Sequence, residues 1–137
     1  MTWDDLRIAA VVALGGVAGT LARFAVVLSV PWHPPAIPWA TLAVNLAGCA
    51  AIGALLTFWN EGSPPAWWVR PLVAVGFVGG FTTFSAFAVE GVRLVEVGAP
   101  GVAALYVVGS VSVGLLLVRG AAEATRWMLR PDRRGVR

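Results

Sequence analysis

The sequence predicts an all-α membrane protein with four transmembrane helices, the third of them broken at mid-membrane. First, 58% of its 137 residues are hydrophobic and only 12% are charged, which is more apolar surface than a soluble domain of this size can bury. Second, four apolar stretches are each about long enough to cross a bilayer as a helix. Third, all seven tryptophans fall at or just outside the ends of these stretches, as in an interfacial aromatic belt.

We expect a single transmembrane domain, 1–137. Its helices are expected at 5–30, 36–59, 69–93 and 97–129, followed by an Arg-rich tail at 130–137. Four crossings place both termini on one side. All ten basic residues are arginines and six of them lie from Arg119 onward, which favours termini in the cytoplasm and a tail near anionic headgroups rather than a nucleic-acid surface. No cleavage site follows Asp4 and Asp5, so we expect no signal peptide.

The first stretch carries Gly15, Gly19 and Arg23 at every fourth position, and therefore on one helix face. The two glycines form a GxxxG pair, which lets another helix approach closely. Arg23 is a charge inside a membrane stretch, and such a charge should face protein or water. Two roles stay open for it: hydrogen bonding to carbonyls at a helix end, or attraction of an ion.

The second stretch has no charge, and places Thr41, Asn45 and Gly48 on one face. A buried amide at mid-membrane is costly unless it is paired. The NH2 group of Asn45 could donate to an anion or to a neighbouring helix. We favour the bond to a neighbouring helix, because polar side chains often hydrogen-bond between membrane helices.

The third stretch contains the pair Gly79-Gly80 followed by Thr82-Thr83, which is a poor helix interior. We expect the helix to break there, and a break in lipid is tolerated only where it is buried, hydrated or bound to an ion. Carbonyls ending the first half suit a cation, and amides opening the second half suit an anion. Phe84 and Phe87 follow at i, i+3 on one face. The pattern indicates an ion pathway rather than a plain anchor.

The fourth stretch carries a short polar stripe, Tyr106 and Ser110, whose hydroxyls are most simply satisfied by the backbone. The chain is not expected to be an enzyme, because no nucleophile–base set, metal cluster or phosphate loop is visible. His33 has no nearby Cys or acid, and Cys49 is the single cysteine, so neither a metal site nor a disulfide is indicated.

Three motifs at matching depths resemble the small four-helix fluoride channels of prokaryotes, the Fluc/CrcB family. Gly15–Phe24 is similar to the pattern GGxxGAxxRY, Thr41–Gly48 to TLxVNxxG, and Gly76–Phe87 to GFxGGxTTFSTF. The likeness covers essentially all four stretches. The departures are Ala86 for Thr, Cys49-Ala50 for Ser-Phe and Phe24 for Tyr.

The resemblance implies an antiparallel dimer of inverted chains, with two fluoride pathways and one structural Na+ held by backbone carbonyls of Gly79 and Thr82. It implies an amide donor, an aromatic lining and a polar track along the pathway, which fall on these residues: Asn45, Phe84, Phe87, Thr83, Ser85, Thr41, Tyr106, Ser110 and Glu90. The partner is a second copy of the chain or a paralogous chain. The Arg-rich tail favours a single orientation and so keeps both open.

The function implied is passive fluoride export across the plasma membrane, and hence fluoride resistance. One alternative is a proton-coupled small multidrug transporter, but that mechanism needs a carboxylate within the first stretch, which instead contains Arg23. Another is a non-transporting assembly subunit, which would explain the GxxxG pair but not a broken helix beside Phe84 and Phe87.

Overall fold

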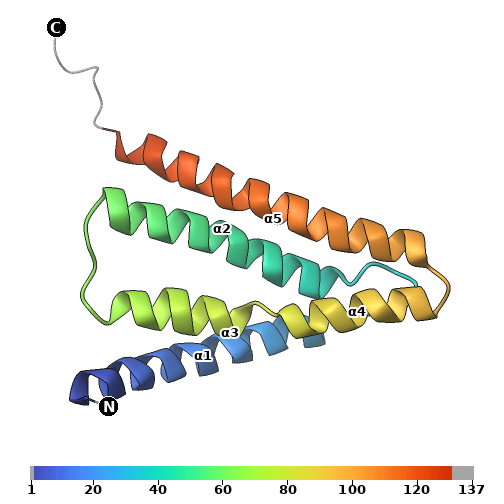
Figure 1. Ribbon diagram of the computed structural model, residues 1–137, viewed down its shortest axis with the longest axis horizontal. Helices are drawn as coiled ribbons and strands as arrows, with labels where there is room; N and C mark the ends of the chain where they lie inside the picture. Colours follow the sequence, from blue (N-terminus) through green and yellow to red (C-terminus); the bar gives the residue numbers. More distant parts are fainter. Residues whose placement is uncertain (1, 131–137) are drawn as a thin grey trace, which may run out of the picture.

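The computed structural model describes residues 2–130, and its regular structure there is helical (Figure 1). Its elements in chain order are α1 (Trp3–Ser29), α2 (Trp39–Glu61), η1 (Pro71–Val78), α3 (Gly79–Phe81), α4 (Phe84–Glu96) and α5 (Pro100–Leu129). The wide-turned π-helix η1, α3 and α4 form one span, so four spans are long and apolar enough to cross a membrane. The predicted fold class, with its interrupted third helix, is confirmed. Most of the Arg-rich tail, residues 131–137, lies outside the described residues.

The spans pack in two pairs, and the start of α1 and the end of α5 lie at the same end of the bundle (Figure 1). α2 lies along α5, while α1 lies along η1 and α3, and α4 leans on α5. A Cβ on Gly15 would come within 2.1 Å of the Leu72 carbonyl oxygen, and one on Gly19 within 2.1 Å of that of Phe77. The GxxxG pair therefore serves close packing inside the chain, of α1 against the first half of the third span.

The third span is interrupted at Thr82 and Thr83, which are both extended (φ −79°, ψ 160° and φ −147°, ψ 123°). The two glycines that also suggested the break are helical, so that part of the expectation is corrected: Gly79 has φ −64°, ψ −37°. Gly80 instead allows contact with α1, because a Cβ there would lie 2.4 Å from the Gly16 carbonyl oxygen. α4 begins at Phe84 because Thr83 caps it: the Thr83 hydroxyl accepts a hydrogen bond from the Ala86 amide (3.3 Å).

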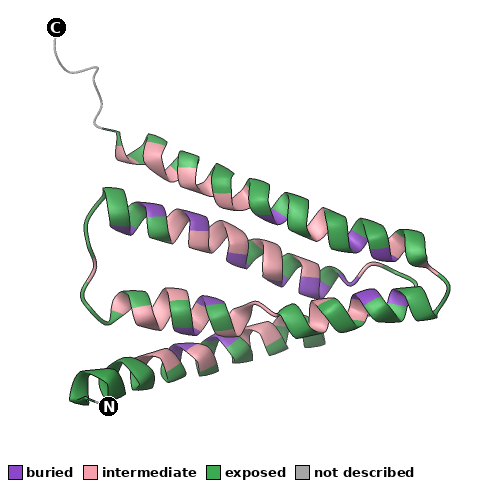
Figure 2. Ribbon diagram, in the orientation of Figure 1, coloured by how far each residue is buried: buried purple, intermediate pink, exposed green. Residues whose placement is uncertain are grey.

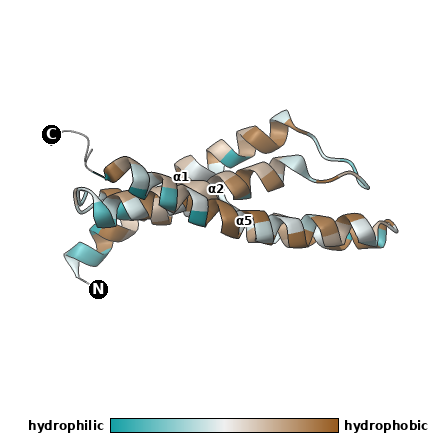
Figure 3. Cartoon of the chain, turned by 90° about the horizontal axis from the view of Figure 1, so that it is seen from above, coloured by the Kyte–Doolittle hydropathy of each residue, from teal (hydrophilic) through white to brown (hydrophobic). Residues whose placement is uncertain are grey.

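Most of the helix surface is exposed in a single chain, and that surface is apolar (Figures 2 and 3). Only 11–28% of the most apolar window of each span is buried inside the chain. These faces are left for lipid or for a partner chain. Trp59 differs from the expected tryptophan belt, because it is buried and the Arg70 guanidinium lies 5.9 Å from its ring centroid.

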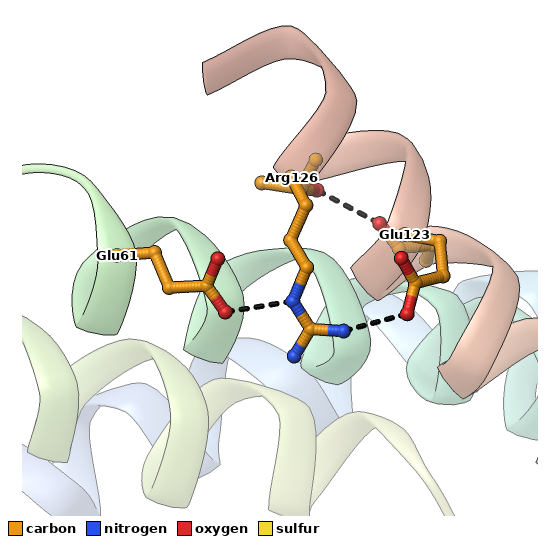
Figure 4. Close-up of polar contacts among 5 residues, drawn as sticks. Glu61, Glu123 and Arg126 are labelled. Atoms are coloured by element: carbon orange, nitrogen blue, oxygen red, sulfur yellow. Dashed lines mark hydrogen bonds and ion pairs between the residues drawn. The ribbon is translucent and has the colours of Figure 1, made fainter. Parts of the chain in front are cut away.

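An ionic cluster joins α5 to α2 at the end of the bundle where α1 begins and α5 ends (Figures 1 and 4). Arg126 contacts the carboxylates of Glu61 and Glu123, each at 2.7 Å. Close by, Arg70 donates to the Trp59 carbonyl (2.9 Å) and to the Asn60 side chain (3.0 Å), which fastens the start of the third span to α2. Since the Arg126 pairs are well exposed, solvent screens them and we expect each to contribute little to stability.

Candidate functional site

The helix break adjoins a cleft of about 340 Å³, which we call the Phe84 cleft. It brings together side chains from α2, the break, α4 and α5: Asn45, Cys49, Thr82, Thr83, Phe84, Phe87, Ser110, Val111, Gly114, Leu115 and Val118. Five of the pathway residues expected from the sequence, on three different spans, thus line one space. The rest of the wall is mostly aliphatic, so the polar groups are few and converge.

The side-chain amide of Asn45 forms two hydrogen bonds with the backbone at the break. Its Nδ2 donates to the Thr83 carbonyl (2.9 Å), and its Oδ1 accepts from the Thr83 amide (2.8 Å). The half-buried amide is therefore paired, through a contact between helices. An NH2 group carries two hydrogens, so one N–H remains for a ligand in the cleft that Asn45 lines.

An aromatic row runs from the mouth of the cleft to the core. The Phe84 and Phe87 ring centroids are 5.9 Å apart with planes tilted by 44°, and Phe87 lies 5.2 Å from Tyr106. Phe84 is 80% exposed in the single chain, although it sits in the middle of a span. Ring edges are weakly positive, so tilted rings can offer edges to an anion.

A second cleft of about 180 Å³, the Arg23 cleft, lies on the other side of the break, and its lining is Thr20, Arg23, Phe24, Val27, Thr41, Thr83, Ala86 and Glu90. Thr83 lines both clefts, so the polar groups form a track past the break. Arg23 Nε donates to the Gly80 carbonyl (3.2 Å), which Thr20 also contacts (3.4 Å). Arg23 thus ties down the end of α3 while its charge stays beside the track.

Glu90 holds a buried cluster in which each carboxylate oxygen has its own hydroxyl donor. Thr41 donates to Oε1 (2.7 Å) and Tyr106 to Oε2 (2.8 Å), and both donors are only 2% exposed. The expectation for the Tyr106 hydroxyl was wrong, because it bonds a carboxylate rather than the backbone. Ser110 does donate to a backbone carbonyl, that of Tyr106. This contact could not be predicted from the order of residues, since Glu90 is 49 residues from Thr41 in the sequence.

Carbonyl oxygens at the break lose their usual helical donors, and those of Gly79 and Thr82 are among them. The Thr83 amide goes to Asn45 instead of to Gly79, and the Ala86 amide goes to the Thr83 hydroxyl instead of to Thr82. Within residues 2–130, the Gly79 and Thr82 carbonyl oxygens accept no hydrogen bond. Unpaired carbonyls in a membrane are costly, and oxygens of this kind suit a hard cation. The chain's own atoms therefore fit the expected cation site.

Some groups were missed or fall elsewhere. Ser85 lines neither cleft and instead lies 3.3 Å from the Thr83 hydroxyl. Thr20 was not among the expected residues, although its spacing of three from Arg23 places it on the same helix face. Cys49 lines the Phe84 cleft, where its sulfur is the nearest neighbour of Gly114 on α5.

The chain as a whole is similar to known proteins. Residues 10–122 match the family described as CrcB-like protein, Camphor Resistance (CrcB). "Fluoride-specific ion channel FluC 2" of Thermobifida fusca is 39% identical over 129 residues, which are 94% of this chain and 93% of the relative. The protein of the same name from Nocardia farcinica is 38% identical over 130 residues, 95% of this chain and 93% of the relative.

"Fluoride-specific ion channel FluC 1" of Mycolicibacterium paratuberculosis is 38% identical over 126 residues, 92% of this chain and 96% of the relative. These relatives are named as channels and not as enzymes, in agreement with the sequence prediction. With four membrane-spanning helices, the chain is a multi-pass protein of the prokaryotic plasma membrane. The match to the family over most of the chain and the identity to full-length relatives show that this protein belongs to the CrcB-like family, the FluC fluoride-channel family.

Proposed function

We propose that this protein conducts fluoride passively across the membrane, along the track formed by the Phe84 cleft, Thr83 and the Arg23 cleft. The observation that carries the proposal is the Phe84 cleft itself, where one free amide N–H, three hydroxyl-bearing side chains and two phenyl rings converge on one space beside a broken helix. The names of the bacterial relatives support fluoride as the ion.

The chemistry of the lining suits a small, strongly hydrated anion. The remaining N–H of Asn45 and the hydroxyl of Thr83 can replace hydration water one contact at a time. The Ser110 hydroxyl would have to leave the Tyr106 carbonyl, to which it donates, before it could do the same. The edges of Phe84 and Phe87 add weak attraction. Conduction requires several modest contacts of this kind, because a single deep site would trap the ion.

Beyond Thr83 the track enters the Arg23 cleft, where the Arg23 charge favours an anion. Glu90 also lines this cleft, but the hydroxyls of Thr41 and Tyr106 each donate to it and draw off part of its negative charge. Asp4 and Asp5 lie in the first turn of α1, far from Arg23 along the helix. A proton-coupled cation transporter would need a free acid at mid-span in α1, so this arrangement counts against that alternative.

The pathway requires a second chain in our proposal. The Phe84 ring is 80% exposed, and the space around Gly79 is open to beyond 4 Å from its Cβ position. An inverted partner would place its own break against this one, because a two-fold axis in the membrane plane passes through mid-membrane. The partner is a second copy or a paralogous chain, and the concentration of arginines near the C-terminus favours one orientation for each chain.

A structural Na+ at this dimer centre would be held by the Gly79 and Thr82 carbonyl oxygens of the chains that meet there. When bound, the ion would compensate the partial negative charge of these oxygens. The residues themselves provide the rest: Asn45 and Thr83 keep the oxygens free, and α1 holds the helix end at Gly80.

The proposed role in the cell is fluoride resistance. Neutral HF crosses lipid and dissociates in the more alkaline cytoplasm, where the anion is trapped without a pathway. A passive pore is sufficient for export, because the inside-negative potential drives anions outward.

Purified protein in liposomes, followed with a fluoride electrode, tests the proposal. We expect rapid fluoride release on addition of a potassium ionophore, and much slower release of chloride from matched vesicles. Absence of fluoride release, or equally fast chloride release, would refute the proposal. Cross-linking of single-cysteine variants in a Cys49→Ala background tests the dimer. Cross-links between the same residue near Gly79 in the two chains, without cross-links at the helix ends, support an inverted pair. Cross-links that join only the same helix end in the two chains contradict it.

A further inference from the structure

We infer that Asn45 is a positioning residue for the cation site, in addition to any contact it makes with fluoride. By accepting the Thr83 amide, it keeps the Gly79 carbonyl oxygen free for the cation. The inference rests on the proposed Na+ site. It names the side chain in each chain that leaves a carbonyl oxygen of this site free to bind the cation.

Helix geometry shows what Asn45 prevents. In an uninterrupted helix the amide of residue i donates to the carbonyl of residue i−4, so Thr83 would donate to Gly79, and Ala86 would donate to Thr82. Asn45 Oδ1 takes the first amide at 2.8 Å, and the Thr83 hydroxyl takes the second at 3.3 Å. Each diverted amide leaves one of the two carbonyl oxygens without its donor.

The face of α2 that carries Asn45 is shaped to hold the break in place. Gly48 follows Asn45 at i, i+3, and a Cβ at Gly48 would lie only 2.1 Å from the Thr82 Cγ2 atom. The absence of this Cβ lets Thr82 lie against α2 while Asn45 reaches the next residue. The Asn45 Nδ2 bond to the Thr83 carbonyl then fixes the peptide units on either side of Thr83.

This arrangement couples two sites that would otherwise be independent. The same amide group accepts from the Thr83 backbone and offers its remaining N–H to the Phe84 cleft. A substitution that removes the acceptor should therefore weaken cation binding, and one that removes only the donor should not.

The first test compares Asn45→Leu with Asn45→Asp in the full-length protein, by measuring dimer stability in detergent as Na+ replaces N-methylglucamine at constant ionic strength. A ligand that binds only the folded dimer stabilises it in proportion to ln(1 + [Na+]/Kd). Asp keeps an oxygen for the Thr83 amide and should retain the Na+ dependence. Leu has no acceptor, so Gly79 regains its helical donor, and half-maximal stabilisation should require about tenfold more Na+.

A second pair tests the same idea at Thr83 without changing Asn45. Thr83→Val removes the hydroxyl that holds the Ala86 amide, so it should also weaken the Na+ dependence, whereas Thr83→Ser should restore it. Ser110→Ala is the matched control, because Ser110 lines the cleft but its hydroxyl bonds the Tyr106 carbonyl, away from the break. We expect its Na+ dependence to equal that of the wild type, whatever its flux.

The outcomes separate this inference from the proposed function. Na+ dependence unchanged in Asn45→Leu would overturn the positioning role of Asn45, whatever Thr83→Val shows. Wild-type protein that conducts fluoride but shows no response to Na+ would overturn the cation site and the inference with it, and would leave the conduction proposal standing. Wild-type protein that responds to Na+ but releases no fluoride would overturn the conduction proposal alone.

Discussion

Replacing Phe84 with isoleucine should abolish most fluoride flux while hardly changing the stability of the chain. Phe84 is 80% exposed in the single chain, and among residues 2–130 its one aromatic contact is with Phe87, at 5.9 Å between centroids. An aromatic pair of this kind contributes about 0.5–1.5 kcal/mol, so the free energy of unfolding should fall by no more than about 1.5 kcal/mol. Isoleucine keeps a large apolar side chain, which limits the loss further.

The flux should respond much more strongly than the stability. A phenyl edge offers weakly positive hydrogens to an anion, and an aliphatic side chain offers none. Loss of about 1.4 kcal/mol of attraction at this ring in the transition state for conduction corresponds to about a tenfold lower rate, and two chains with the same substitution would affect both pathways. The assay is fluoride efflux from liposomes, with thermal unfolding measured in parallel on the same preparations.

Phe58→Ile is the matched control, because Phe58 on α2 is also exposed and lines neither cleft. It should conduct like the wild type. Wild-type flux in Phe84→Ile would show that the ion does not pass this ring, and the pathway drawn through the Phe84 cleft would be wrong. Equal losses in the two variants would show that the assay reports general damage to the protein.

Three further predictions follow from the packing. Gly19→Ala places a Cβ 2.1 Å from the Phe77 carbonyl oxygen and should cost about 1–3 kcal/mol of stability, whereas Gly109→Ala meets nothing within 4 Å and should be neutral or slightly stabilising, both measured by thermal unfolding. Tyr106→Phe removes one of the two hydroxyl donors to Glu90 and should cost about 1–3 kcal/mol in the same assay; an unchanged melting temperature would show that the cluster is not needed. Cys49 lines the Phe84 cleft, so a small methanethiosulfonate reagent should block flux through the wild type and leave flux through Cys49→Ala unaffected; block of both would place the reagent elsewhere.

The helix break shows where sequence reasoning was accurate and where it fell short. Two glycines followed by two threonines correctly marked the segment, because backbone propensity is local. The break itself lies at Thr82 and Thr83, since Gly80 is held in the helix by close contact with α1. Backbone propensity takes no account of contacts between spans. Such a contact decided that the two threonines, and not the two glycines, left the helix.

The polar side chains followed the same division. Asn45 stood out because an amide group is costly inside a membrane and therefore needs a partner, whereas Thr41 and Glu90 were expected from the family resemblance. Their partners were not readable from spacing: Asn45 pairs with the backbone of Thr83, 38 residues away, and Glu90 with Tyr106 across α4 and α5.

What the sequence by itself determined is the number of crossings, the segment that breaks and the family motifs, because hydropathy, backbone propensity and residue order are properties of the chain alone. The tertiary structure decided which donors and acceptors meet, and above all that the Thr83 amide turns to Asn45 and leaves the Gly79 carbonyl free. The physical reason is that a hydrogen bond depends on two groups being within about 3 Å of each other. Only the packing of α2 against the broken span brings these groups that close.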